Sequence, residues 1–276
     1  MPFSILLQHC APQHLLSRLT GILARCRIKW FKNWSIRRLI RVHGVNLSEA
    51  ASTNLDDYPC FNSFFTRSLR PECRPLVAGP KKIASPVDGS VSQAGVIQNG
   101  TIFQAKGFDY SAISLLGGSA ARAALFDQGQ FATFYLAPGD YHRVHMPCDG
   151  KLLNTVYVPG RLYSVNPETV SHVPQLFSKN ERLICLFETE AGPMAMILVA
   201  AMLVGQIQTV WSEHVASKNI AIKNPGAVIL KKGGEIGRFL MGSTVIVLFA
   251  QNSMQWDTRI QEGCGVKMGE GIGNFS

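Results

Sequence analysis

Short apolar segments separated by glycine, proline and asparagine constrain the fold of this chain most strongly. They begin at about Ile83 and include GSVSQAGVI, FATFYLAPGD, GKLLNTVYVPG, RLICLFET, AMILVAAMLVG and STVIVLFAQ. Segments of this length and spacing are typical of strands joined by tight turns. The sequence therefore predicts an α+β protein in which residues 71–276 form a mainly antiparallel β body. A short helix is expected within it, at SAISLLGG.

The N-terminal segment has a different composition. Residues 1–48 contain eight Lys and Arg side chains and no Asp or Glu, so they carry nearly all of the net charge of +9. Leucine and isoleucine recur there at helical spacing, and the stretch KWFKNWSIRRLIRV then combines Trp30 and Trp34 with five basic residues. Tryptophan beside lysine and arginine is typical of a helix lying on an anionic membrane. We therefore predict that residues 1–70 form a helical, membrane-associating region.

Two alternatives remain for this basic segment. It could be an ordinary surface helix packed on the body, or it could bind single-stranded nucleic acid, which basic and aromatic residues also do. We favour the membrane and expect no nucleic-acid partner. The apolar run Met194–Val204 is too short to cross a bilayer, which takes about 20 residues, and we expect buried strands there.

Cysteine usage gives no sign of a disulfide framework or a zinc site. The seven cysteines are scattered and form no Cys-x-x-Cys pair, which favours a reducing compartment. His142 and His145 could share a metal ion, but no third ligand has suitable spacing, so no metal is predicted.

Local motifs supply several candidates for chemistry. They are Asp88 in SPVDGSV, Lys106 in QAKGFDY, the histidines of APGDYHRVHMP, Cys148 beside them, and the tripeptide Gly242-Ser243-Thr244. Each has a plain structural explanation as well, because aspartate before glycine usually belongs to a turn and a single histidine or lysine is usually structural.

Ser243 fits two kinds of chemistry. The chain order Asp88, His145, Ser243 permits a Ser-His-Asp hydrolase acting on lipids, although no Gly-x-Ser-x-Gly turn is present and a strand follows the serine. Alternatively, the serine hydroxyl could attack the unhindered carbonyl of Gly242. Elimination and hydrolysis would then leave a pyruvoyl group, an electron sink made from the protein itself. The residues alone leave both chemistries open.

Taken together, the motifs resemble those of bacterial phosphatidylserine decarboxylase proenzymes. The similar segments are SPVDG, QAKG, DYHRVHMP, YVPGRLYSVNP, GPMAMILV and KGGEIGRFLMGSTVI, in order between FNSFFTRSLRP and KMGEGIG. The resemblance implies a peripheral enzyme on the cytoplasmic side of the cell membrane, a homodimer that converts phosphatidylserine to phosphatidylethanolamine and CO2. It further implies a Schiff base to a covalent pyruvoyl group, with no added cofactor.

The resemblance also implies roles for individual residues. Ser243 would become the pyruvoyl group after scission between Gly242 and Ser243, which gives a β chain of residues 1–242 and an α chain of residues 243–276. Met241 stands where the family usually has leucine, a substitution of similar volume that self-cleavage should tolerate.

Four further positions match residues with family roles. His145 would take the proton from the Ser243 hydroxyl, and Asp88 would orient and stabilise the resulting imidazolium. His142 would contact the substrate or manage a proton during decarboxylation, and Ser164 would line the substrate pocket.

Overall fold

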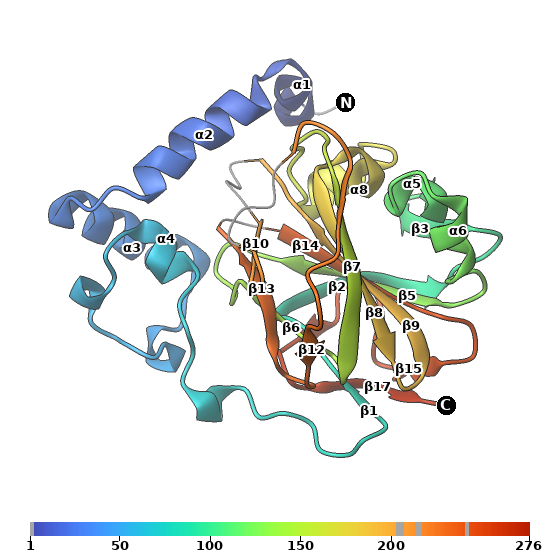
Figure 1. Cartoon of the computed structure of the whole chain (residues 1–276). Coiled ribbons are helices and arrows are strands. Elements are labelled where there is room, and N and C mark those ends of the chain that lie inside the picture. Colours follow the sequence, from blue (N-terminus) through green and yellow to red (C-terminus); the bar gives the residue numbers. More distant parts are fainter. Residues whose placement is uncertain (1–2, 203–206, 213–216, 241–242) are drawn as a thin grey trace.

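The computed structural model describes residues 3–202, 207–212, 217–240 and 243–276, and it shows a β body flanked by N-terminal helices (Figure 1). The flanking helices are α1 (Phe3–Cys10), α2 (Gln13–Ala24), α3 (Lys29–His43) and α4 (Phe61–Phe65), with 3-10 turns η1 (Leu47–Glu49), η2 (Leu55–Asp57) and η3 (Pro71–Cys73). The body contains the short helices α5 (Ala112–Leu115), α6 (Ala120–Ala124), α7 (Pro167–Val170) and α8 (Leu176–Lys179). The helix expected at SAISLLGG is therefore confirmed by α5.

A large antiparallel sheet forms the centre of the body. Its strand order within the described residues is β11-β7-β8-β9-β14-β5-β2-β16, and β12 also pairs with β7. The strands are β2 (Gly89–Val96), β5 (Gln130–Leu136), β7 (Gly150–Val158), β8 (Arg182–Thr189), β9 (Gly192–Val199), β11 (Ala221–Lys223), β12 (Ile229–Leu230), β14 (Ser243–Phe249) and β16 (Gly265–Val266). The antiparallel body predicted from the apolar segments is confirmed.

Three smaller antiparallel sheets complete the described part of the body. They are β1 (Lys82–Ala84), β17 (Gly271–Phe275) and β15 (Met254–Trp256); β10 (Ile207–Thr209), β13 (Glu235–Phe239) and β6 (Arg143–His145); and the hairpin β3 (Thr101–Ala105) with β4 (Phe108–Ser111). The second of these sheets matters most for function, because β6 carries the DYHRVHMP motif and β13 leads directly towards Ser243.

Strand β14 lies between β5 and β9 and is buried along its whole length. Its β-branched and aromatic side chains therefore pack on both faces of the sheet, which explains why the sequence there is continuously apolar instead of alternating. The apolar run that begins at Met194 forms β9, a buried strand as predicted. Among the described residues, no helix combines the length and apolar character needed to span a bilayer.

The N-terminal helices contribute to two cores. Ile5 of α1 is fully buried in the main core of the body. Helix α3 and α4 share a separate small core of Ile36, Leu39, Val45, Tyr58, Phe64 and Phe65. In α2 the buried side is made of Gln13, Ser17, Gly21 and Ala24, whereas the large apolar side chains Leu15, Leu19, Ile22 and Leu23 are at least half exposed. The helical character predicted for residues 1–70 is confirmed, and the domain division at residue 70 stays a prediction.

Candidate active site

Ser243 is the first residue of β14 and is completely buried. Its backbone pairs with Leu136 of β5, and its Oγ has no hydrogen-bond partner among the described residues. A buried hydroxyl without a partner is costly, because it has lost its hydrogen bonds to water. Gly242, the other half of the predicted scissile bond, lies outside the described residues, as does Met241.

His142 lies beside the segment that leads to Ser243. The backbone N–H of Phe239, at the end of β13, donates to the His142 carbonyl at 3.1 Å. The imidazole is fully buried and stacks on Phe65, with 4.0 Å between the ring centroids. Neither ring nitrogen makes a hydrogen bond of normal geometry.

The surroundings of His142 keep its ring neutral. Burial lowers the pKa of His142 to about 3, and the positive charge of Arg67 acts in the same direction, while the Ala137 and Pro138 carbonyls oppose the shift weakly. A neutral imidazole can accept a proton with one nitrogen and donate one with the other. His142 is therefore equipped to hold or move a proton near the start of β14.

His145 is fixed by two hydrogen bonds. Its Nδ1 lies 2.8 Å from the Gly233 carbonyl oxygen, and its Nε2 lies 3.0 Å from the Tyr141 hydroxyl. A carbonyl can only accept, so Nδ1 carries the proton and Nε2 presents its lone pair to the tyrosine hydroxyl. Burial lowers the pKa of His145, which favours the neutral form that a general base requires.

Asp88 lies in the turn that precedes β2 and is buried, with 1% of its surface exposed. Its carboxylate accepts hydrogen bonds from Arg74, Lys267 and the backbone N–H of Met268. Gly89 directly after it has φ near +150°, and a Cβ there would lie 2.2 Å from the Tyr135 carbonyl oxygen, so the turn requires glycine.

The predicted contact between Asp88 and His145 takes a different form in this structure. The Nδ1 of His145 is used by the Gly233 carbonyl, and the recorded partners of the Asp88 carboxylate are Arg74, Lys267 and Met268. The two segments still touch, because the His145 backbone N–H donates to the Pro86 carbonyl at 2.9 Å. Burial lowers the pKa of His145; the Gly233 hydrogen bond and the charge of Glu235 oppose this shift, and the charge of Asp88 adds a smaller effect in the same sense. Among the described residues, Asp88 and His145 are not joined by a direct hydrogen bond.

Ser164 lines a cavity of about 250 Å³ at the junction of the helices and the body. Phe65, which stacks on His142, and Leu136, which pairs with Ser243, also line it. The remaining lining residues are Leu39, His43, Phe61, Tyr135, Pro138, Val165, Asn166, Ala201 and Met202. The cavity is thus mostly apolar and joins the surroundings of Ser164, His142 and Ser243.

The other candidates lie away from this cavity. Lys106 is exposed at the turn between β3 and β4. Cys148 is buried, its thiol 3.9 Å from the Met194 sulfur, and burial raises its pKa to about 12, so it is a poor nucleophile. Within the described ranges, no group of three or more His, Cys, Asp and Glu residues is placed to hold a metal ion.

Sequence reasoning missed three groups that shape the site. Arg74 donates hydrogen bonds to Asp88, and the Gly233 carbonyl accepts one from His145. The Tyr141 hydroxyl forms a hydrogen bond with the same histidine ring. Tyr141 stands inside the DYHRVHMP motif and could have been singled out there. Gly233 stands inside the motif KGGEIGRFLMGSTVI, but it acts through its backbone carbonyl, which the residue type does not reveal. Arg74 lies outside the quoted motifs.

Comparisons with known proteins identify the family. A family model described as phosphatidylserine decarboxylase matches residues 61–274, which is most of the chain. The chain belongs to the phosphatidylserine decarboxylase family. A second family model, described as PSD, matches residues 3–44, so both the helical region and the body carry recognisable family sequence.

Individual phosphatidylserine decarboxylase proenzymes are similar along nearly the whole chain. The proenzyme of Ectopseudomonas mendocina is 50% identical and covers 98% of this chain and 97% of its own length. The proenzyme of Pseudomonas entomophila is 50% identical over 96% of this chain and 95% of its own length. That of Hahella chejuensis is 47% identical over 98% of this chain and 93% of its own length. Membership in a decarboxylase family gives no support to the lipid hydrolase alternative.

Proposed function

We propose that this chain cuts itself between Gly242 and Ser243 and then decarboxylates phosphatidylserine to phosphatidylethanolamine and CO2. The observation that carries the proposal is Ser243, a completely buried serine whose Oγ has no partner, placed where His142 adjoins the preceding strand. The proenzyme names of relatives about 50% identical support the same reaction. The products of scission are a β chain, residues 1–242, and an α chain, residues 243–276.

Self-cleavage begins with the Ser243 hydroxyl. Its Oγ attacks the Gly242 carbonyl carbon, His145 takes the hydroxyl proton, and the peptide C–N bond breaks as the Ser243 nitrogen is protonated. Elimination from the ester then leaves Gly242 with a carboxylate and residue 243 as dehydroalanine. Addition of water and loss of ammonia convert that residue to a pyruvoyl group.

The catalytic residues are in suitable protonation states for these steps. His145 is neutral, its Nδ1 proton is held by Gly233, and its Nε2 lone pair is the basic position. The Tyr141 hydroxyl donates a hydrogen bond to that lone pair. It must therefore either move away or relay the proton when His145 acts as the base. The Asp88 charge favours the imidazolium that forms, which is the role proposed for this carboxylate.

The surroundings of residue 243 suit a pyruvoyl group. It would replace residue 243, which is completely buried, and would be joined to Thr244, whose backbone pairs with both β5 and β9. A pyruvoyl group supplies an electron sink for amine-bearing substrates, as pyridoxal phosphate does in other decarboxylases. The apolar cavity beside Ser164 excludes water from the substrate, and neutral His142 holds a proton close to the reacting atoms.

The N-terminal helices bring this site to the membrane. An open groove along α3 is lined by basic and aromatic side chains, among them Trp30, Trp34 and Arg38, and Trp30 is 73% exposed. The exposed leucines and isoleucine of α2 add an apolar surface. This arrangement supports peripheral binding to the anionic cytoplasmic face of the cell membrane, which the substrate itself helps to charge. The homodimer expected from the family resemblance remains part of this proposal.

The reaction can be tested with phosphatidylserine in detergent micelles. The purified protein should release CO2 and form phosphatidylethanolamine without any added cofactor. Ser243→Ala should remain a single chain and form no product, whereas Ser253→Ala, a serine near the other end of β14, should cut itself and react like the wild type. Activity of Ser243→Ala equal to that of the wild type would refute the proposal.

A further inference from the structure

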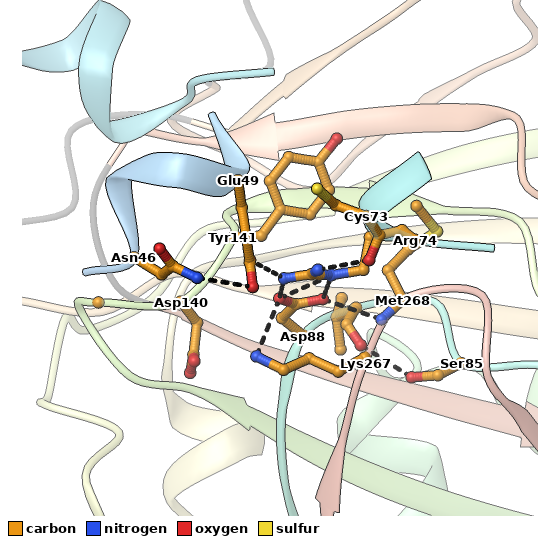
Figure 2. A network of polar contacts seen from close by, with 12 residues as sticks. Asn46, Glu49, Cys73, Arg74, Ser85, Asp88, Asp140, Tyr141, Lys267 and Met268 are labelled. Carbon is orange, nitrogen blue, oxygen red and sulfur yellow. Dashed lines mark hydrogen bonds and ion pairs between the residues drawn. The ribbon is translucent and has the colours of Figure 1, made fainter. Parts of the chain in front are cut away.

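The Asp88 carboxylate is held mainly by one arginine. Arg74 donates from Nε to both carboxylate oxygens, at 2.9 and 3.1 Å, and its Nη2 also contacts Oδ2. The backbone N–H of Met268 donates to Oδ1 at 2.9 Å, and Lys267 lies 3.4 Å from Oδ2. Figure 2 shows the Arg74 guanidinium lying directly against the Asp88 carboxylate.

Arg74 is the buried cation of this network, and Lys267 is the exposed one. The side chain of Arg74 is 7% exposed and that of Asp88 2%, whereas 51% of the Lys267 side chain faces solvent. Water screens the lysine charge and leaves the arginine charge strong. Burial opposes the charge of Arg74, but its hydrogen bonds to Asp88 and Glu49 outweigh this and raise its pKa. These contacts therefore favour the charged form of the guanidinium.

The guanidinium is in turn fixed from the helical region. Its Nη2 donates to Glu49 Oε2 at 2.6 Å, and its Nη1 donates to the Cys73 carbonyl at 2.7 Å. Glu49 belongs to η1, shortly after α3, and accepts a second hydrogen bond from Asn46 at 3.2 Å. Figure 2 shows the Glu49 and Asp88 carboxylates both next to the Arg74 guanidinium, and its Nη2 donates to each of them.

The position of the Asp88 charge matters because its effect is exerted at a distance. The His145 ring is oriented by the Gly233 carbonyl, and the His145 backbone N–H donates to the carbonyl of Pro86, two residues before Asp88. The charge of Asp88 adds a small effect that favours the imidazolium. Such an influence depends on where the carboxylate is held and on whether it stays ionised. Removing one partner of a buried ion pair leaves the other charge uncompensated, so we expect the Asp88 carboxylate to move from its place without Arg74.

We propose that Arg74 is a positioning residue for self-cleavage, which holds the Asp88 carboxylate in place while Glu49 of the helical region holds Arg74. This inference rests on the proposed function. In the described part of the chain, the side chain of Arg74 bonds Asp88, Glu49 and the Cys73 carbonyl and does not line the cavity beside Ser164. We therefore expect it to act on scission through Asp88 and to take no part in decarboxylation. The contact also makes formation of the active enzyme depend on docking of η1.

Scission is measured as the fraction of chains cut at successive times after synthesis in a cell-free translation system. Arg74→Gln should slow scission at least about tenfold, and Arg74→Lys, which keeps the charge but not the paired donors, should recover part of the loss. Glu49→Gln should slow scission only about threefold, because Arg74 would still bind the Asp88 carboxylate. The matched control is Arg70→Gln, four residues away, whose 3.4 Å ion pair with Glu72 is exposed; it should cut at the wild-type rate.

A second measurement separates positioning from general destabilisation. Decarboxylation per pyruvoyl group, counted by α chain, should be the same in the chains of Arg74→Gln that do cut as in the wild type. Soluble guanidinium at millimolar concentration should restore scission of Arg74→Gly, and it should not restore that of Asp88→Asn.

Several results would overturn the inference. The first is that Arg74→Gln is cut at the wild-type rate. The second is that its decarboxylation per pyruvoyl group falls as much as its scission does. The third is that guanidinium does not restore scission of Arg74→Gly. If Arg74→Gln is insoluble, the test uses Arg74→Lys instead. The inference is contradicted if Arg74→Lys is cut no faster than Asp88→Asn, and it is supported if Arg74→Lys is cut partially. A wild-type chain that stays uncut would instead refute the proposed function.

Discussion

The β body buries its large apolar side chains, whereas helix α2 in the N-terminal region exposes them. In the body, β14 pairs with β5 and β9 and buries every side chain from Ser243 to Phe249 on the two faces of the sheet. In α2, small and polar residues face the protein, and the large apolar side chains face outward. In the body, the side chains of Ser243, His142 and His145 are all buried. In α2, the exposed apolar side chains leave a surface of the kind that binds membranes or other proteins.

We infer from this difference that the two regions have separate tasks, although apolar and polar contacts join them. Ile5 of α1 is buried in the core of the body, and Phe65 of α4 stacks on His142. Gln8 and Gln13 of the helices accept hydrogen bonds from the backbone N–H groups of Ser164 and Leu162. Arg74 joins Glu49 to Asp88. Substitutions that affect folding, chemistry and membrane binding should therefore fall in different regions.

The largest contrast should appear in stability. Phe249→Ala removes a ring that is 1% exposed and packs on Trp256 and Phe275, so it should lower the free energy of unfolding by about 3–5 kcal/mol. Leu19→Ala, at a half-exposed position of α2, should change it by less than about 0.5 kcal/mol. Urea unfolding of both variants in the uncut Ser243→Ala background measures the difference. Equal losses would show that α2 is packed as tightly as the body.

The closed site should also make stability depend on pH through His142. Its pKa is lowered from 6.5 in the unfolded chain to about 3 in the folded protein. Between these values the unfolded chain binds the extra proton, so the free energy of unfolding falls as the pH falls below 6.5. At pH 4.5 the loss due to this residue is about 2–3 kcal/mol.

His142→Gln is the matched variant for that measurement, because it keeps a polar side chain and cannot titrate. Urea unfolding at pH 7 and pH 4.5, again in the uncut Ser243→Ala background, should show a smaller loss in His142→Gln than in the parent. The lowered pKa of His145 acts in the same direction in both proteins and cancels. A loss of the same size in both would mean that His142 is not buried as a neutral ring.

The smallest effect concerns the outward-facing helices. Replacing Trp30 and Trp34 together by alanine should weaken binding to phosphatidylserine vesicles about tenfold and leave stability unchanged. Phe103→Ala, an exposed apolar residue of the body, should bind like the wild type. High salt should weaken binding of all three proteins, since it screens the basic residues. Loss of binding in Phe103→Ala but not in the tryptophan variant would place the membrane surface on the body instead.

The sequence predicted the strands of the body well, because a strand that is buried on both faces leaves a continuous apolar run such as Val245–Phe249. The residue types of the site were also evident from the motifs. The motifs did not reveal which of these residues contact one another. Whether Asp88 bonds His145 or Arg74 depends on how a turn before β2, a loop after η3 and strand β6 meet in space.

The orientation of α2 was likewise beyond local reasoning. The leucine spacing predicted an apolar face, and such a face usually turns towards the core. Here the polar side makes specific hydrogen bonds to the body, with Gln13 accepting from Leu162, and the apolar side is left outside. Periodicity gives the faces of a helix, and only tertiary structure says which of them is buried.

The mass of the intact chains tests the central claim most directly. Mass spectrometry of the purified protein should find residues 1–242 with an ordinary carboxyl terminus, together with residues 243–276 in which the first residue is a pyruvoyl group without an α-amino nitrogen. The smaller chain should resist Edman degradation and react with hydrazine reagents that detect ketones. A single chain of 276 residues that nevertheless releases CO2 from phosphatidylserine would contradict the account.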